Sequence, residues 1–218
     1  MPHKIRLTAF GLVVVLGSAW GAAEAGLGLA LNACAKSASG SIMTGLAVFF
    51  LVAARLKTGS ARGPLLAAVL AAGFKLFDAA LLGLPVRDGA VANPVFALAL
   101  ETAAVVLIFG AFARAESQGR KGQALIGVGA AGLSALAFPL VNLATGVPAC
   151  LRPGSSLPLS VAFAPLALAA GALAAPLAFA FSTRAAAGTG EIHPALRWAA
   201  PAAAAFLGLV AVALLRAA

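Results

Sequence analysis

The feature that most constrains this chain is a series of long apolar segments separated by short polar breaks. Only 10% of its 218 residues are charged, whereas soluble domains carry roughly a quarter. A helix of about 20 apolar residues crosses the roughly 30 Å hydrocarbon core of a bilayer. We find seven candidate spans, at residues 8–34, 41–54, 64–84, 91–113, 123–145, 157–181 and 195–215. The second is short, so it could be tilted or partly re-entrant.

Helices are expected because backbone amides in lipid must form hydrogen bonds within their own segment, and the alternating pattern of a membrane β-barrel is absent. The sequence therefore predicts an all-α, polytopic membrane helix bundle of six to seven transmembrane helices. No long hydrophilic stretch interrupts it, so we expect one integral membrane domain over residues 1–218. Residues 7–115 hold the polar site, and residues 122–217 form an alanine-rich helical half that resembles a scaffold.

The basic residues act as topology signals, because lysine and arginine are retained on the cytoplasmic side. With a cytoplasmic N-terminus, ten fall in cytoplasmic segments and four, Lys36, Arg87, Arg152 and Arg216, fall outside. This bias predicts a multi-pass membrane protein with a cytoplasmic N-terminus, in contact with membrane lipid. The net charge of +9 is spread between apolar runs rather than gathered on a basic face, so we expect no nucleic-acid partner.

The N-terminal region also resembles a secretory signal. Lys4 and Arg6 precede an apolar run, and Ala23-Glu24-Ala25 resembles a cleavage site. The apolar stretch continues past that site to Ala33, which favours a retained first span. Cleavage would change both the orientation and the role of Glu24.

Cofactor, metal and enzyme chemistry are not indicated. The two histidines, His3 and His193, fall in cytoplasmic segments, so no metal or haem site is expected. Catalytic sets of residues are absent from the spans, which argues against an enzyme. The chain also lacks a phosphate-binding loop, so ATP-driven work would require a partner. Cys34 and Cys150 both fall outside, where they could form a disulfide or remain two separate thiols.

Four charged residues, Glu24, Lys75, Asp78 and Glu101, lie within the predicted spans. Charged side chains at such depth are costly and usually face the bundle interior. A rise of about 1.5 Å per residue puts all four between the midplane and the outer third. Lys75 and Asp78 are three residues apart and can pair. Three carboxylates against one lysine leave an excess negative charge that requires a proton, a cation or a hydrogen-bonding ligand, although a purely structural network is the alternative.

Two further residues complete the predicted ligand site. Trp20 lies one turn before Glu24 and could offer a flat wall to a ring-shaped ligand, or could be a packed core residue. Asn93 begins the predicted fourth helix, where it could act as a cap, and Pro94 suits a first helical turn. The predicted ligand-binding residues are Trp20, Glu24, Lys75, Asp78, Asn93 and Glu101. Small residues at four-residue spacing on the first helix, Gly17, Ala19, Gly21 and Ala23, form a candidate partner-binding surface.

Residues 10–112 resemble the S components, the substrate-capture subunits of energy-coupling factor transporters. The resemblance rests on Trp20-Gly21 with Glu24, Ser39-Gly40, Lys75, and Asn93-Pro94 with Glu101. It implies a protein of the bacterial inner (plasma) membrane that binds a vitamin-like solute from the outer side. The solute then passes inward with the help of a transmembrane coupling subunit and cytoplasmic ATPases. In that family an Ala-x-x-x-Ala pattern on the first helix contacts the coupling subunit, and Ala19 and Ala23 match it. The family usually has six spans, so a seventh is a departure.

Two other functions remain open on the sequence alone. The chain could be a non-transporting anchor or scaffold subunit of a larger complex, with its buried charges in structural pairs. It could also be a stand-alone proton- or cation-coupled carrier that uses the same carboxylates as titrating sites. A closed, dry region around Glu24 and Glu101 would favour the scaffold, and an outward-open cavity would favour capture.

Overall fold

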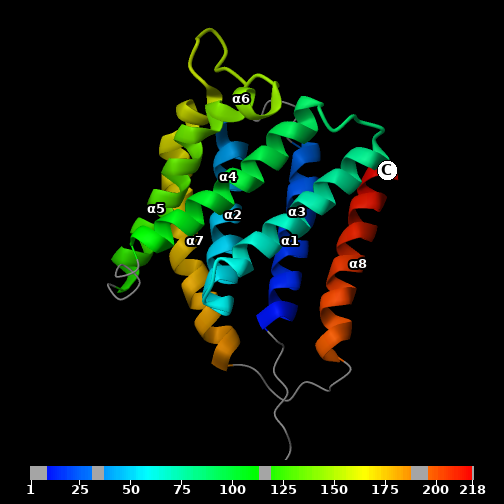
Figure 1. Ribbon diagram of the computed structural model, residues 1–218, viewed down its shortest axis with the longest axis vertical. Coiled ribbons are helices and arrows are strands. Elements are labelled where there is room, and N and C mark those ends of the chain that lie inside the picture. The colour runs from blue at the N-terminus through cyan, green and yellow to red at the C-terminus, as the bar shows by residue number, and fades with distance from the viewer. Residues whose placement is uncertain (1–8, 31–36, 113–118, 188–195, 218) are drawn as a thin grey trace, which may run out of the picture.

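The computed structural model describes residues 9–30, 37–112, 119–187 and 196–217 (Figure 1). The described helices are α1 (Ala9–Ala30), α2 (Ser37–Thr58), α3 (Arg62–Leu81), α4 (Gly89–Ala111), α5 (Gly119–Ala137), α6 (Val141–Thr145), α7 (Leu159–Ala187) and α8 (Leu196–Ala217). Within these ranges, seven helical segments are long and apolar enough to cross a membrane. The predicted all-α membrane bundle is confirmed, with seven spans.

The second span is longer than the sequence predicted. α2 is one continuous helix of 22 residues, so neither a short nor a re-entrant segment forms here. The predicted range stopped at Ala54 because Arg55 follows it. Arginine and lysine can extend their charged ends toward the membrane surface while their stems stay among apolar groups, so Arg55 and Lys57 continue the last turn. Lys57 Nζ donates a hydrogen bond of 2.8 Å to the Ser182 carbonyl oxygen on α7.

Two other helix boundaries also differ from the predictions. α4 begins at Gly89 rather than near Asn93, because the Asp88 carboxylate accepts a hydrogen bond of 2.8 Å from the Ala90 amide and caps the helix there. Pro94 is therefore inside α4. The fifth span is interrupted by a 3-10 turn, η2 (Phe138–Leu140), between α5 and α6. Pro139 has no amide hydrogen to continue the α-helical pattern.

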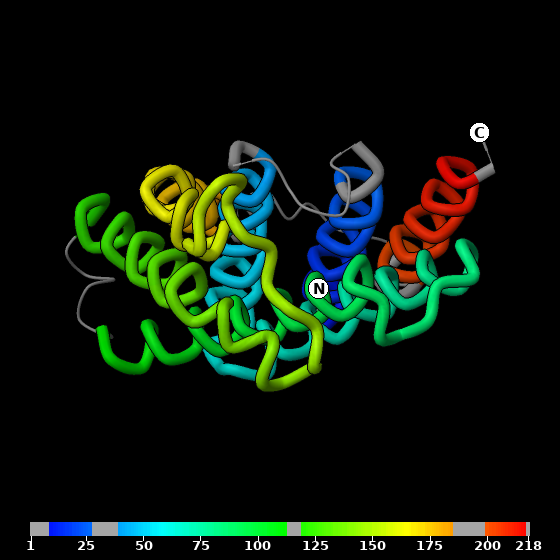
Figure 2. The backbone as a smooth tube through the Cα atoms, turned by 90° about the horizontal axis from the view of Figure 1, so that it is seen from above, coloured from blue at the N-terminus to red at the C-terminus, as the bar shows by residue number. Residues whose placement is uncertain are grey.

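The helices are arranged as a row with a crossing layer. In Figures 1 and 2, α7, α2, α1 and α8 follow one another along the row, and α3 and α4 cross one side of it at a slant. α1 begins at the lower end of Figure 1 and α8 finishes at the upper end. The chain therefore changes sides overall, as an odd number of crossings requires. α6 and the loop before α7 lie at the upper end.

Glycines allow two helix pairs to approach closely. On α1, a Cβ at Gly17 would lie 2.9 Å from the Ala67 Cα, and one at Gly21 would lie 2.7 Å from the Phe74 side chain. Gly17 and Gly21 therefore contact α3 of the same chain rather than a separate partner. The other two residues of the predicted partner-binding surface differ, because Ala19 is exposed and Ala23 is half-buried. Between α5 and α7, a Cβ at Gly127 would overlap the carbonyl oxygen of Gly171.

The α5–α7 contact predicts that Gly127→Ala destabilises the protein. The added methyl group meets backbone rather than a flexible side chain, so the helices must separate, at a cost of about 1–3 kcal/mol. Gly110→Ala is the matched control, because nothing lies within 4 Å of a Cβ there and alanine is the better helix former. Thermal unfolding of the detergent-purified proteins measures both, and equal stability of the two variants would contradict the packing described here.

Candidate functional site

A cavity of about 280 Å³ lies at the end of the bundle where α2, α4 and α7 begin. Its volume is near the lower end of the range of about 300–1,000 Å³ typical of small-molecule sites. Its polar lining consists of Glu24, Thr44, Lys75, Asn93, Glu101, Ser134 and Ser160. Apolar side chains, including Met43, Leu100, Phe138 and Phe163, form much of the remaining wall. The cavity thus combines a few polar groups with an apolar surface, as ligand pockets do.

Two buried carboxylates line this cavity from different helices. Glu24 on α1 and Glu101 on α4 are close enough to repel each other electrostatically. Glu24 Oε1 accepts a hydrogen bond of 3.3 Å from Trp20 Nε1, one turn earlier on the same face of α1. The Thr44 hydroxyl on α2 interacts with the Glu101 carboxylate. Neither glutamate forms an ion pair within the described residues.

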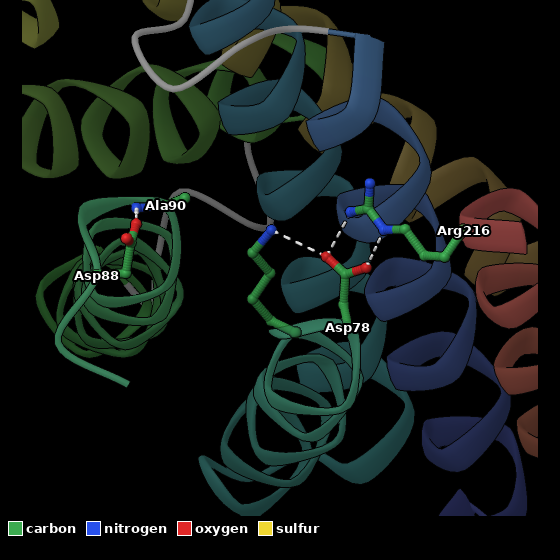
Figure 3. A network of polar contacts seen from close by, with 5 residues as sticks. Asp78, Asp88, Ala90 and Arg216 are labelled. Carbon is green, nitrogen blue, oxygen red and sulfur yellow. Dashed lines mark hydrogen bonds and ion pairs between the residues drawn. The ribbon is translucent and has the colours of Figure 1, made fainter. Parts of the chain in front are cut away.

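Asp78, in contrast, is fully paired. Its carboxylate accepts hydrogen bonds from Arg216 Nε at 2.5 Å and from Arg216 Nη2 at 2.7 Å (Figure 3). Lys75 Nζ donates to Asp78 Oδ2 at 3.3 Å. The Asp78 side chain is only 1% exposed, and a two-pronged arginine contact is among the strongest that a carboxylate forms. This pairing joins α8 to α3.

Four of the six predicted ligand-binding residues, Glu24, Lys75, Asn93 and Glu101, line one cavity. They come from α1, α3 and α4, as the common depth of the charges suggested. Trp20 is a fully buried core residue that contacts Glu24 and does not line the cavity. Asp78 does not line it either, because its carboxylate is held by Arg216 and Lys75. The binding roles of these residues stay predictions.

Two polar atoms at the cavity have no hydrogen-bond partner among the described residues. They are Asn93 Oδ1 on α4 and Ser160 Oγ on α7, both buried. Ser160 as a whole is only 5% exposed. Buried polar groups nearly always have a partner, and an orphan requires an explanation. A bound solute in the cavity would supply the missing partner to both atoms.

Four polar residues of this region were not predicted from the sequence. They are Thr44, Ser134, Ser160 and Arg216, and the last three belong to the half interpreted as scaffold. A serine or threonine near a helix end resembles an ordinary cap, so nothing in the sequence distinguishes Thr44 or Ser160. Arg216 could have been found, because three buried carboxylates against one lysine require another cation. It was instead assigned to the outer surface.

Some sequence predictions fall beyond the described ranges. Cys150 lines the cavity and is disulfide-bonded, whereas Cys34 lies outside the described residues. His3, His193 and Lys36 also lie outside them. In the part of the chain that the structure describes, no cluster of three or more His, Cys, Asp or Glu side chains could hold a metal ion.

The arrangement suits binding of a small polar molecule. The Glu24 and Glu101 carboxylates, the Lys75 ammonium and the two polar atoms without a partner among the described residues can form hydrogen bonds with it. Phe138 and Phe163 can contact its apolar part. No known protein family, curated protein or solved structure matches this chain.

The Asp78 network predicts strong coupling between two distant positions. Arg216→Gln leaves the buried Asp78 carboxylate with Lys75 alone and should lower the free energy of unfolding by about 3–5 kcal/mol, as breaking a buried pair does. Asp78→Asn should also destabilise, and the double variant should lose less than the two single losses combined. Thermal unfolding of the wild type, the two single variants and the double variant gives a double-mutant cycle. Strictly additive losses would show that the two side chains do not interact.

Proposed function

We propose that this chain is the substrate-capture subunit of a membrane importer. It binds a small vitamin-like solute from the outer side of a bacterial inner membrane, and a coupling subunit and ATPases then drive import. The observation that carries this proposal is the cavity that Glu24, Glu101 and the orphan atoms of Asn93 and Ser160 line together. The chain itself performs no covalent chemistry.

The contrast between Asp78 and the two glutamates supports binding rather than a structural role. A carboxylate inside a membrane bundle is expensive unless it is paired. Asp78 meets this requirement through Lys75 and Arg216. Glu24 and Glu101 have no such ion pair within the described residues and face a cavity instead. A scaffold subunit would gain nothing from this arrangement. A solute-binding subunit requires such groups to contact its ligand.

The distribution of basic residues supports an outward-facing cavity. At the end opposite the cavity, the described helix ends carry Arg55, Lys57, Arg62, Arg120, Lys121 and Arg184. At the cavity end, Arg87 and Arg152 lie in the loops before α4 and α7, and Arg216 lies in the last turn of α8. The excess of positive charge is retained in the cytoplasm. The N-terminus is therefore cytoplasmic in our proposal, and the solute enters from outside.

The surface that would contact a coupling subunit is smaller than the one predicted. Gly17 and Gly21 are covered by α3, which leaves Ala19 and Ala23 on α1. These two alanines lie one turn apart on one face. Small residues at this spacing let another helix approach closely, and they match the pattern that the S components use. We assign the coupling contact to this pair.

A retention experiment tests solute capture. Detergent-purified protein is incubated with a bacterial metabolite extract and washed, and the retained small molecules are identified by mass spectrometry. We expect at least one compound to be retained about tenfold less by Glu101→Gln and by Ser160→Ala, since a lost hydrogen bond to a charged or orphan group costs about 1–3 kcal/mol.

Thr102→Ser is the control for that experiment. Thr102 is buried on the same helix as Glu101, but its hydroxyl donates to the Leu98 carbonyl oxygen and it does not line the cavity. A set of retained compounds that is identical in wild type and both cavity variants would contradict the proposal. Transport of the retained compound in liposomes that contain this chain alone would favour the stand-alone carrier.

A further inference from the structure

We infer that the captured solute is a small organic monocation that carries N–H donors next to an aromatic or similarly flat apolar part. This inference rests on the proposed function and adds the chemical class of the solute. It depends on three features of the cavity, namely its charge, its hydrogen-bonding groups and its apolar wall.

The charge of the cavity region determines the sign of the solute. Glu24, Asp78 and Glu101 provide three carboxylates, and Lys75 and Arg216 provide two cations. One formal negative charge is left over among these five groups when all of them are ionised. Arg87, Asp88 and Arg152 lie at the same end of the bundle but do not line the cavity. A ligand with a single positive charge would balance the five groups in place of the proton that two neighbouring carboxylates otherwise share.

The positions of the ion pairs indicate that the positive charge of the solute lies next to Glu24 and Glu101. Arg216 binds Asp78 with two hydrogen bonds, and Arg216 does not line the cavity. Lys75 lines the cavity, but its ammonium is paired with Asp78 and only attracts the Glu24 carboxylate electrostatically. Among the described lining residues, an anionic solute would meet Glu24 and Glu101 with no unpaired cation to offset them. An ammonium or protonated ring nitrogen would instead donate to both carboxylates.

The remaining lining groups suit the rest of such a molecule. Ser160 Oγ and Asn93 Oδ1 are buried and lack partners among the described residues, so both can accept further N–H or O–H groups. Phe138 and Phe163 provide two aromatic side chains, and aromatic faces attract cations. Two carboxylates, two orphan acceptors and two rings together favour an aminated ring over a carboxylic acid.

A matched probe panel tests the charge preference. Benzylamine, benzyl alcohol and benzoate share one ring and differ in charge, as do tryptamine, tryptophol and indole-3-acetate. Binding to the detergent-purified chain is measured by calorimetry and by thermal stabilisation. We expect each amine to bind at least about tenfold more tightly than its alcohol, which corresponds to about 1.4 kcal/mol, and the carboxylates to bind most weakly.

Variants of the cavity residues identify the groups that cause the preference for amines. Glu24→Gln and Glu101→Gln should each reduce the preference for the amine about tenfold. Asp88→Asn removes a carboxylate near the cavity but keeps a good helix cap, and it should leave the preference unchanged. Equal or tighter binding of the carboxylates, an amine preference that survives both glutamine variants, or no binding by any probe would overturn the inference. Retention of a neutral or anionic metabolite by the wild type would overturn it too, while leaving solute capture intact.

Discussion

The requirement to neutralise ionised groups among apolar helices shapes this molecule more than any other interaction. Asp78 meets it within the chain, through Lys75 on its own helix and Arg216 from α8. The same contact fastens the last helix to the bundle. Glu24 and Glu101 line one cavity, with Trp20 and Thr44 as hydrogen-bonding neighbours. One carboxylate thus stabilises the fold, and the other two line the cavity without an ion pair among the described residues.

Packing by small residues makes this division possible. Gly17 and Gly21 bring α3 against α1, which sets Lys75 and Glu24 close enough to interact. Gly127 and Gly171 bring α5 against α7, the two helices that carry Ser134 and Ser160 at the cavity. The cavity therefore forms between two closely packed groups of helices, and both halves of the chain contribute to it. The alanine-rich half is therefore not only a scaffold, because it contributes Ser134 and Ser160 to the cavity.

Much of the architecture follows from the sequence, because apolar length determines a membrane span almost by itself. The charges of the first four spans also indicated a shared depth, and Glu24, Lys75 and Glu101 do line one cavity. Contacts between distant segments could not be predicted. The orientation of Trp20 into the core, the pairing of Asp78 with Arg216 and the inward position of Ser160 all depend on which helix faces are in contact. Local spacing does not determine that choice.

Labelling of Ser160→Cys in intact cells tests most directly whether this polar cavity is accessible from outside. Ser160 lines the cavity, and the native Cys150 is disulfide-bonded and should not react; the unsubstituted chain gives the background. A membrane-impermeant thiol reagent should label Ser160→Cys without permeabilisation and should label Thr102→Cys, which lies outside the cavity lining, far more slowly. Labelling of Ser160→Cys only from the cytoplasmic side, or from neither side, would contradict a cavity that opens to the outside.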